Sequence, residues 1–223
     1  PGGNWEGKTI LNRSRDPDLR DDPTEAALAQ ARTVLLAARE RRIPPALDDK
    51  ILADWNGLMI AALARASLIF GRTDWLDAAR GAFSFIGAFM QHDCDGEARL
   101  WHSWRNGTAR HVATLDDYAN MSRAALMLYE ATGEAVYIDH ARSWAGVLER
   151  HYRDDTAGGY FLTADDTADV ITRTKNAHDN ATPSGNGTMT DVLARLYHLT
   201  GEEAYRRDAE ALVSAFSGEV VIR

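Results

Sequence analysis

Apolar residues recur along the chain in two alternating kinds of helical segment. One kind is apolar nearly all round, as a helix is when other elements cover most of its surface; the other has one apolar stripe opposite a charged face. The first kind spans 55–70, 118–132 and 186–200, and the second spans 74–91, 134–151 and 202–216. This alternation predicts three helical hairpins, each with an inner and an outer helix.

A further striped helix is predicted over 22–41, in front of these hairpins. Asp22-Pro23-Thr24-Glu25 supplies a cap, a proline at the first helical position and a glutamate three residues after the cap. Residues 1–21 are rich in Gly, Asn, Arg and Asp, which predicts a leading loop or linker. Because the chain begins at Pro1 and closes on the strand-like Val220-Val221-Ile222, we expect it to be a piece of a longer protein.

Three glycines separate the inner from the outer helices and define a repeat. Each is followed four residues later by an aromatic residue and eight residues later by an alanine: Gly71 with Trp75 and Ala79, Gly133 with Tyr137 and Ala141, Gly201 with Tyr205 and Ala209. Glycine readily adopts the left-handed conformation that ends a helix in a tight turn. Repeats of 62 and 68 residues with two helices each predict a curved array or toroid, because one hairpin cannot bury its inner face alone.

The connection 92–114, between the first outer helix and the next inner helix, predicts a β-hairpin. Asn106-Gly107 is a strong two-residue turn signal between 100–105 and 108–113. His102 and His111 would face each other across this hairpin, from where they could reach the neighbouring polar residues.

The connection 153–184 has a similar length and position. In it, 158–163 is expected to pair with 170–174 as a second small hairpin. All short glycine turns then lie on one rim of the array, and both long connections lie on the other. Long ordered loops on a rigid scaffold are where binding and chemistry usually occur, so the second rim is the expected functional face.

The polar clusters of the sequence are in register with this repeat. Sixteen residues before the three glycines stand Trp55, Asp117 and Gly185. The residues that this register gathers on the functional rim are Asp48, Asp49, Lys50, Asp54, Trp55, Asn56, Asp116, Asp117, Tyr118, His178, Asp179, Asn180, Ser184 and Asn186. Aromatic faces stack on sugar rings, while carboxylates and amides hydrogen-bond sugar hydroxyls, so the mixture suits carbohydrate recognition.

Within this set, four residues are candidates for catalysis. Asp116, Asp117 and Asp179 are predicted to do acid and base work, since two carboxylates across a pocket can cleave a glycosidic bond. In an epimerase-like mechanism a histidine moves the proton next to a carbonyl, and His178 is the candidate. The residues predicted to bind substrate are Asp49, Lys50, Asp54, Trp55, Asn56, Tyr118, Ser184 and Asn186.

Structural roles compete with these assignments. Helix capping alone would explain Asp54, Asp116 and Ser184, which stand where helix caps belong. Trp55 and Tyr118 begin apolar helices, where an aromatic side chain usually belongs to the core. Lys50 would also serve to neutralise an adjacent aspartate. For Asp117, a like-charge neighbour is costly without a partner or a purpose, which favours a function.

Composition narrows the possible partners. With 45% hydrophobic and 26% charged residues among 223, the chain has the composition of a soluble globular protein. A net charge of -8 and a pI near 5.3 argue against nucleic acid and anionic membrane surfaces. The apolar run 58–70 is interrupted by Arg65 and is too short to span a bilayer.

The single cysteine indicates the cellular compartment, and the absence of metal-binding and nucleotide-binding sequence motifs indicates which cofactors to expect. Cys94 has no partner for a disulfide and cannot form a multi-cysteine zinc site, which fits a reducing, cytoplasmic compartment. The histidine and carboxylate spacings match no metal motif, and neither a dinucleotide fingerprint nor a phosphate loop occurs. We therefore expect neither a metal nor a cofactor.

Three blocks carry a resemblance to a known family. They are Asp48-Asp49-Lys50-Ile51-Leu52 followed by Trp55-Asn56-Gly57-Leu58-Met59-Ile60, then Leu115-Asp116-Asp117-Tyr118-Ala119, then Ala181-Thr182-Pro183-Ser184-Gly185-Asn186. In this order they resemble the YyaL and spermatogenesis-associated protein 20 family of thioredoxin-domain-containing proteins. The match spans nearly the whole chain.

The resemblance implies an all-α fold, an (α/α) toroid of the six-hairpin type shared with certain glycosidases and N-acylglucosamine 2-epimerases. It implies that 22–223 is about half of such a ring, three hairpins plus one preceding helix, with small β-hairpins in the long loops. The family's thioredoxin-like domain and the remainder of the toroid would belong to the parent chain. The expected function is a carbohydrate-active module, a sugar hydrolase or epimerase; the alternative is a non-catalytic glycan- or protein-binding scaffold serving the thioredoxin-like domain.

Overall fold

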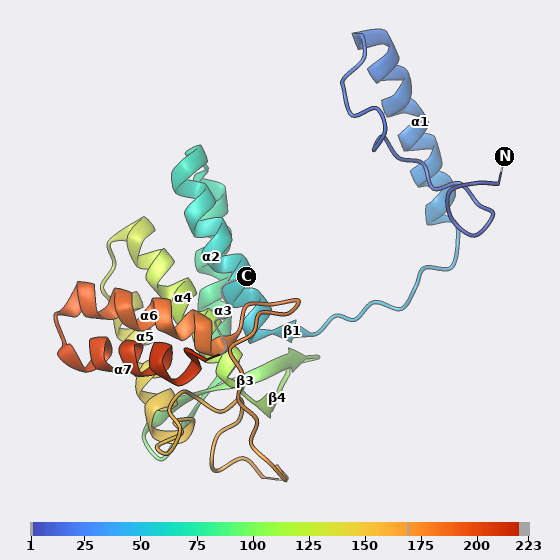
Figure 1. Cartoon of the computed structure of the whole chain (residues 1–223). Helices are drawn as coiled ribbons and strands as arrows, with labels where there is room; N and C mark the ends of the chain where they lie inside the picture. Colours follow the sequence, from blue (N-terminus) through green and yellow to red (C-terminus); the bar gives the residue numbers. More distant parts are fainter. Residues whose placement is uncertain (1, 169, 219–223) are drawn as a thin grey trace. The chain divides into compact units, whose positions relative to one another are not determined.

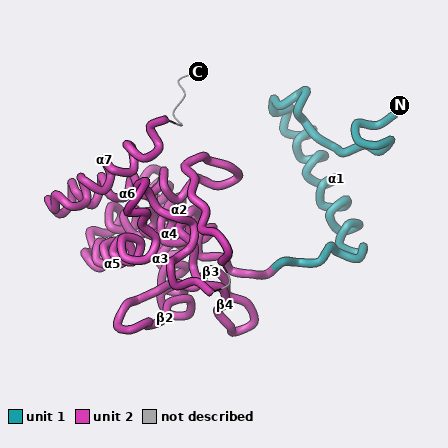
Figure 2. Tube along the Cα trace, turned by 60° about the horizontal axis from the view of Figure 1, so that its bottom comes forward, with its two compact units in different colours: residues 1–48 teal, residues 49–223 magenta. Residues whose placement is uncertain are grey.

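The computed structural model describes residues 2–168 and 170–218, in two compact units, Pro1–Asp48 and Asp49–Arg223 (Figures 1 and 2). The first unit holds helix α1, Asp22–Glu40. Its cap is Asp21, one residue before the predicted Asp22, and the Asp21 side chain accepts the Thr24 N–H. The domain boundary after residue 21 stays a prediction, and the expected extended segment 220–222 lies outside the described residues.

The second unit contains the three expected hairpins (Figure 1). Their helices are α2 (Ala53–Phe70) with α3 (Thr73–Phe89), α4 (Leu115–Thr132) with α5 (Val136–His151), and α6 (Gly185–Thr200) with α7 (Glu203–Phe216). Gly71, Gly133 and Gly201 end the three inner helices with φ of 64, 72 and 73°, the left-handed conformation that the repeat predicts. Hydrophobic periodicity thus located each helix to within a few residues.

Helix α4 is the centre of the unit. Both α2 and α6 pack against it, and each outer helix packs on the inner helix of its own hairpin. The approach of α2 to α4 is close: a Cβ on Gly57 would stand 2.6 Å from the Asn120 carbonyl carbon. Whereas α4 is buried on nearly all sides, α2 is not, because Trp55, Met59 and Ile69 are exposed on it.

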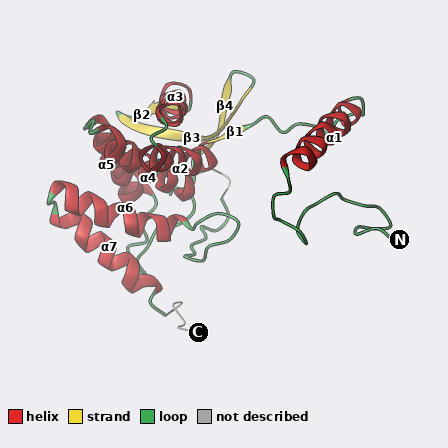
Figure 3. Cartoon of the chain, turned by 90° about the horizontal axis from the view of Figure 1, so that it is seen from above, coloured by secondary structure: helices red, strands yellow, loops and turns green. Residues whose placement is uncertain are grey.

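A small antiparallel sheet contacts the helices of the first two hairpins, α2 to α5 (Figure 3). Its strands are β1 (Ile51–Leu52), β2 (Gln91–Cys94), β3 (Glu97–Arg105) and β4 (Thr108–Val112). The long β3 pairs with the other three strands. Asn106 and Gly107 join β3 to β4 with φ of 50 and 78°, which confirms the predicted two-residue turn. The register places His102 opposite His111.

The second expected hairpin does not form a regular ladder. Among the described residues of 153–184, the backbone N–H of Leu162 donates to the Thr174 carbonyl at 2.7 Å, but no strand results. The Lys175 ammonium donates to the Asp154 carboxylate at 2.7 Å, which links this segment to the turn that follows α5. None of the helices in the described ranges is long and apolar enough to cross a membrane.

Candidate functional site

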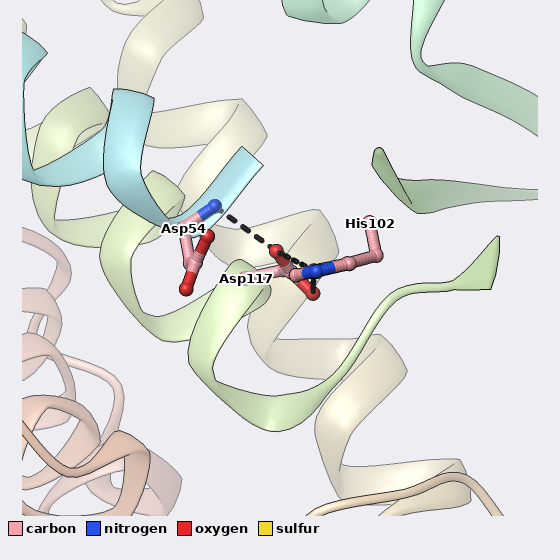
Figure 4. A group of neighbouring side chains, drawn as sticks. All are labelled: Asp54, His102 and Asp117. Atoms are coloured by element: carbon pink, nitrogen blue, oxygen red, sulfur yellow. Dashed lines mark hydrogen bonds and ion pairs between the residues drawn. The ribbon is translucent and has the colours of Figure 1, made fainter. Parts of the chain in front are cut away.

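Asp117 is the most heavily bonded carboxylate of the rim (Figure 4). It stands at the third position of α4 and is fully buried. Its Oδ2 accepts the Thr114 backbone N–H at 2.7 Å and the Thr114 hydroxyl at 2.9 Å, which makes a capping box. Its Oδ1 accepts the Asp54 backbone N–H at 3.0 Å, so the same carboxylate also caps the start of α2.

His102 joins Asp117 from strand β3 (Figure 4). Its Nδ1 lies 3.0 Å from both carboxylate oxygens. Because an ionised carboxylate only accepts hydrogen bonds, Nδ1 must carry the proton, and Nε2 is left to exchange one. The hydrogen bond to Asp117 raises the pKa of His102 against the opposing effect of burial. The histidine is thus held in one tautomer by a buried acid.

Asp116 reaches the third inner helix. Its Oδ1 accepts the Gly185 backbone N–H, the first of α6, at 2.9 Å. A Cβ on Gly185 would stand 2.5 Å from this same oxygen, so only glycine fits here. Burial raises the pKa of Asp116, and the charge of Asp117 adds to the effect. The adjacent carboxylates of α4 therefore bind the N-termini of both neighbours, α2 through Asp117 and α6 through Asp116.

Asp54 completes the acidic group. It is partly buried, and its Oδ1 accepts the Trp55 backbone N–H at 2.8 Å. Burial raises the pKa of the Asp54 carboxyl, and the nearby Asp117 raises it further. Carboxyls with raised pKa values beside a histidine are suited to donating and accepting protons. Asp54, His102, Asp116 and Asp117 are called the acidic cluster below.

The capping alternative is correct for Ser184 and wrong for Asp54 and Asp116. The Ser184 side chain accepts the Gly187 N–H at 3.0 Å and caps α6. By contrast, α2 and α4 begin after Leu52 and Thr114, so Asp54 and Asp116 lie inside their own helices. Asp116 does cap a helix, but a neighbouring one.

Two residues predicted to bind substrate belong to the core instead. Tyr118 is 0% exposed, and its hydroxyl accepts the Leu100 N–H at 2.9 Å. Asn186 is 1% exposed, and its amide exchanges hydrogen bonds with the backbone of Tyr160 at 2.8 and 2.9 Å. The Tyr118 side chain thus links strand β3 to α4, and the Asn186 side chain links the loop at Tyr160 to α6, so both side chains are buried in packing contacts.

The remaining candidates on α2 and before it are accessible. Asp49 and Lys50 are exposed, and Asp49 forms an ion pair with Arg105. Trp55 is 61% exposed, so it is not a core residue and offers an aromatic face beside the acidic cluster. Asn56 donates to the Leu52 carbonyl at 2.8 Å and thereby secures the first turn of α2.

His178 and Asp179 lie in the segment that leads into α6, and both are exposed. The Asp179 Oδ1 accepts the Ser184 N–H at 3.0 Å. Asp179 also lines an open hollow of about 920 Å³ between α2, α4 and α6. This hollow touches none of the four residues of the acidic cluster, but its lining residues Pro183 and Gly187 flank Gly185, which bonds to Asp116.

Two groups of side chains in the described residues have the spacing of metal ligands. Asp54, His102 and Asp117 place one ligand atom each within 4.8 Å of one another, and so do His151, Asp165 and Asp166. In the first group, the His102 Nδ1 already bonds to Asp117, so a cation would have to displace that proton. The residues fit a proton-transfer site better than a metal site.

The sequence did not identify His102 as a member of the acidic cluster. Its only signal was its position opposite His111 in the predicted hairpin, which left both histidines able to reach the rim. In the structure His102 bonds to Asp117, whereas His111 is exposed. The role of Thr114 carried a clearer signal, because a threonine three residues before an acidic residue is a capping box pattern.

This array of helical hairpins has its structural neighbours among six-hairpin toroid folds. An α-mannanase of glycoside hydrolase family 76 from Bacteroides thetaiotaomicron has a TM-score of 0.62 at 18% identity; the match covers 80% of this chain and 46% of that one. Cellobiose 2-epimerase from Spirochaeta thermophila has a TM-score of 0.60 at 18% identity, over 75% and 43% of the two chains. At these identities the likeness shows the fold.

The chain belongs to glycosyl hydrolase family 76, which it matches over residues 11–221. It is also 29% identical to human spermatogenesis-associated protein 20 over 231 residues, 97% of this chain and 29% of that protein. The resemblance that the three sequence blocks carry is thereby confirmed. This chain spans between 26 and 30% of the length of the curated relatives it matches.

Proposed function

We propose that this toroid module binds a carbohydrate and acts on it by acid–base chemistry at the acidic cluster. The observation that carries the proposal is the 3.0 Å contact between His102 Nδ1 and the buried Asp117 carboxylate, with Asp54 and Asp116 alongside. Asp117 positions the histidine, and the His102 Nε2 takes or gives the proton. The family and the fold supply the substrate class, since the relatives that share them act on sugars by name.

Two reactions suit this group of residues. In hydrolysis, a carboxyl with a raised pKa protonates the leaving oxygen while a second carboxylate acts on the anomeric carbon or a water; Asp116 and Asp54 would divide these roles. In epimerisation or isomerisation, His102 would remove a proton next to a carbonyl, the role predicted for His178 from the sequence. Trp55, exposed beside Asp54, would stack on the sugar ring.

The other predicted site residues would contact the substrate or stabilise the helices that carry the site. Asp179 and His178 would act from the hollow beside α6, where Asp179 is one of the lining residues. Asp49 and Lys50 would contact substrate from the exposed segment before α2. Asn56 and Ser184 support the site through the first turns of α2 and α6.

The proposal extends to the parent protein. The chain covers 46% of the mannanase and 43% of the cellobiose 2-epimerase that share its fold, which supports its being about half of a toroid. The remainder of the ring and a thioredoxin-like domain would then be the partners of this module. We place the parent protein in the cytoplasm, where a free cysteine such as Cys94 stays reduced.

A non-catalytic scaffold is the second candidate, and one observation favours it. The Asp116 and Asp117 carboxylates both accept backbone N–H groups at the N-termini of neighbouring helices. Both side chains therefore have a structural role that needs no catalysis. In that case the rim would hold a glycan or a protein segment for the thioredoxin-like domain.

The test compares four variants of the full-length protein by thermal shift and by turnover of a panel of mono- and oligosaccharides. His102→Asn keeps a donor near the Nδ1 position but removes Nε2, and Asp116→Asn keeps an acceptor for the Gly185 N–H. His178→Asn tests the histidine named from the sequence, and His198→Asn, on an exposed site of α6, is the matched control. Ligand binding raises the melting temperature by mass action.

We expect a sugar that stabilises wild type, with turnover lost in His102→Asn and Asp116→Asn and kept in the control. Release of reducing ends identifies hydrolysis, and deuterium uptake from D₂O next to the carbonyl identifies epimerisation. Binding of a sugar without turnover of any sugar would favour the non-catalytic scaffold. A protein that binds no sugar would contradict the carbohydrate proposal itself.

A further inference from the structure

Arginines from all three inner helices line the hollow between α2, α4 and α6. They are Arg65 on α2, Arg123 on α4 and Arg195 on α6. This concentration runs against the charge of the chain, which is -8 overall. Arg65 and Arg195 also hold equivalent places in the repeat, each six residues before the glycine that ends its helix.

The three arginines differ in how their charge is balanced. Arg195 pairs with Glu130 and lies 3.9 Å from Asp191, so its charge is met within the hollow. For Arg65 and Arg123, the part of the chain that the structure describes offers no carboxylate within ion-pair distance. The remaining acid, Asp179, is engaged by the Ser184 N–H at 3.0 Å. Two guanidinium groups are therefore available to an acidic ligand.

The arginines are also aligned with the acidic cluster. On α4, Arg123 follows Asp116 by seven residues, two helical turns or about 10 Å along the same face. On α2, Arg65 follows Asp54 by eleven residues, three turns or about 16 Å, again on one face. Each of these helices thus presents a carboxylate at its N-terminal end and a guanidinium deeper along the same stripe.

Asn120 adds an independent observation on the α4 stripe. It stands between Asp116 and Arg123 at helical spacing, is 1% exposed, and neither of its amide atoms has a hydrogen-bond partner in the described structure. A buried amide without partners is costly. Asn120 does not itself line the hollow, so its amide is a polar group enclosed beneath that surface. The stripe is therefore polar along its length where a core helix would be apolar.

We infer that this hollow is an anion subsite, in which Arg65 and Arg123 bind the phosphate or carboxylate group of an acidic saccharide. The inference rests on the proposed function and names its substrate class. Guanidinium groups bind both anions through paired, charge-assisted hydrogen bonds. The anionic group would then lie in the hollow, and the sugar would extend past Pro183 and Gly187, which line the hollow and flank Gly185, toward Asp116.

The experiment is calorimetric titration of the full-length protein with matched pairs of ligands. Glucose 6-phosphate and mannose 6-phosphate are compared with glucose and mannose, glucuronate with glucose, and inorganic phosphate serves as the anion alone. The variants are Arg65→Gln/Arg123→Gln and the control Arg142→Gln, whose arginine pairs with Glu202 outside the hollow. Urea unfolding checks that each variant folds.

We expect the acidic member of one pair to bind at least about tenfold more tightly than its neutral parent, since a charged hydrogen bond contributes that much. The double variant loses this preference and the control retains it. Comparison of the phosphorylated sugars with glucuronate identifies which anion the subsite takes. Equal binding of neutral and acidic sugars, or a preference that survives in the double variant, overturns the inference and leaves the proposed function standing. Binding of inorganic phosphate alone, or of no sugar, overturns both.

Discussion

The Asp117 carboxylate on α4 accepts the backbone N–H of Asp54 on α2 at 3.0 Å, across 63 residues of sequence. The neighbouring Asp116 accepts the Gly185 N–H on α6 across 69 residues. Both separations are close to one repeat, so the two bonds join each inner helix to the next at the same rim. Adjacent acidic residues on the central helix thus hold the starts of the three inner helices together at the rim where we propose the chemistry.

Loss of the Asp117 carboxylate is expected to destabilise the unit strongly. Asp117→Ala leaves the Asp54 and Thr114 N–H groups without an acceptor and His102 without its buried partner. Breaking a buried charged pair in this way costs roughly 3–5 kcal/mol of unfolding free energy. Urea denaturation measures it, with Asp191→Ala, an exposed residue of α6, as a control expected to change stability by less than about 0.5 kcal/mol. Equal stabilities of the two variants would show that Asp117 does not organise the rim.

The close approach of α2 to α4 makes Gly57 irreplaceable. In Gly57→Ala the new Cβ would lie 2.6 Å from the Asn120 carbonyl carbon, so the helices must separate at a cost of roughly 1–3 kcal/mol. Gly81→Ala is the matched control, because Gly81 lies inside α3 with open space where its Cβ would be. That change should stabilise the protein by roughly 0.5–1 kcal/mol through helix propensity. Thermal melts that move in the same direction for both variants would contradict this packing.

Replacement of Asp54 by Asn should raise the stability of the protein and abolish its turnover. Burial and the charge of Asp117 raise its pKa, so the ionised form is disfavoured in the folded state. Asp54→Asn removes that charge and is expected to stabilise the protein at neutral pH by roughly 0.5–2 kcal/mol, as charge relief at functional sites commonly does. The same variant should lose turnover under the proposed function. Chemical denaturation and sugar turnover are measured on one preparation, and a destabilised variant would assign Asp54 to the scaffold alone.

The architecture could be predicted from the sequence because its determinants are local. Helix periodicity and the left-handed glycines Gly71, Gly133 and Gly201 need only neighbouring residues, and each prediction is confirmed. The repeat register also placed Asp116 and Asp117 on one rim. What these carboxylates bind was not predictable, since their partners lie 63 and 69 residues away and depend on how the inner helices cross.

The same limit explains the misassigned residues. Tyr118 and Asn186 sit at the rim in sequence register, yet their side chains turn into the core, where Leu100 and Tyr160 receive them. The position of a residue in the sequence repeat determines which end of the helix it occupies. Whether its side chain is buried depends on the strand or loop that packs against that end. His102 was not identified from the sequence, because its contact with Asp117 depends on how strand β3 packs on α2 and α4.

The pH dependence of stability should report the contact between His102 and Asp117. Since the hydrogen bond to Asp117 raises the pKa of His102 above 6.5, the imidazolium is favoured in the folded state. The contribution of the pair is fully present below pH 6.5 and is lost as the pH rises through the folded-state pKa. The sign follows because the folded protein binds more protons there than the unfolded chain.

The comparison of wild type with His102→Asn tests this effect. The variant also loses the His102 charge that lowers the pKa values of Asp54 and Asp116, so the comparison reports on His102 together with the carboxyls around it. We expect the difference in unfolding free energy between the two proteins to shrink steadily from about pH 6 to pH 9. NMR titration of the His102 ring gives the folded-state pKa directly, and His198→Asn, at an exposed site of α6, is the control for replacing a histidine. A difference that stays constant with pH would mean that the pKa of His102 is the same in the folded and unfolded chain, and the charged contact with Asp117 on which the proposed proton transfer rests would then lose its basis.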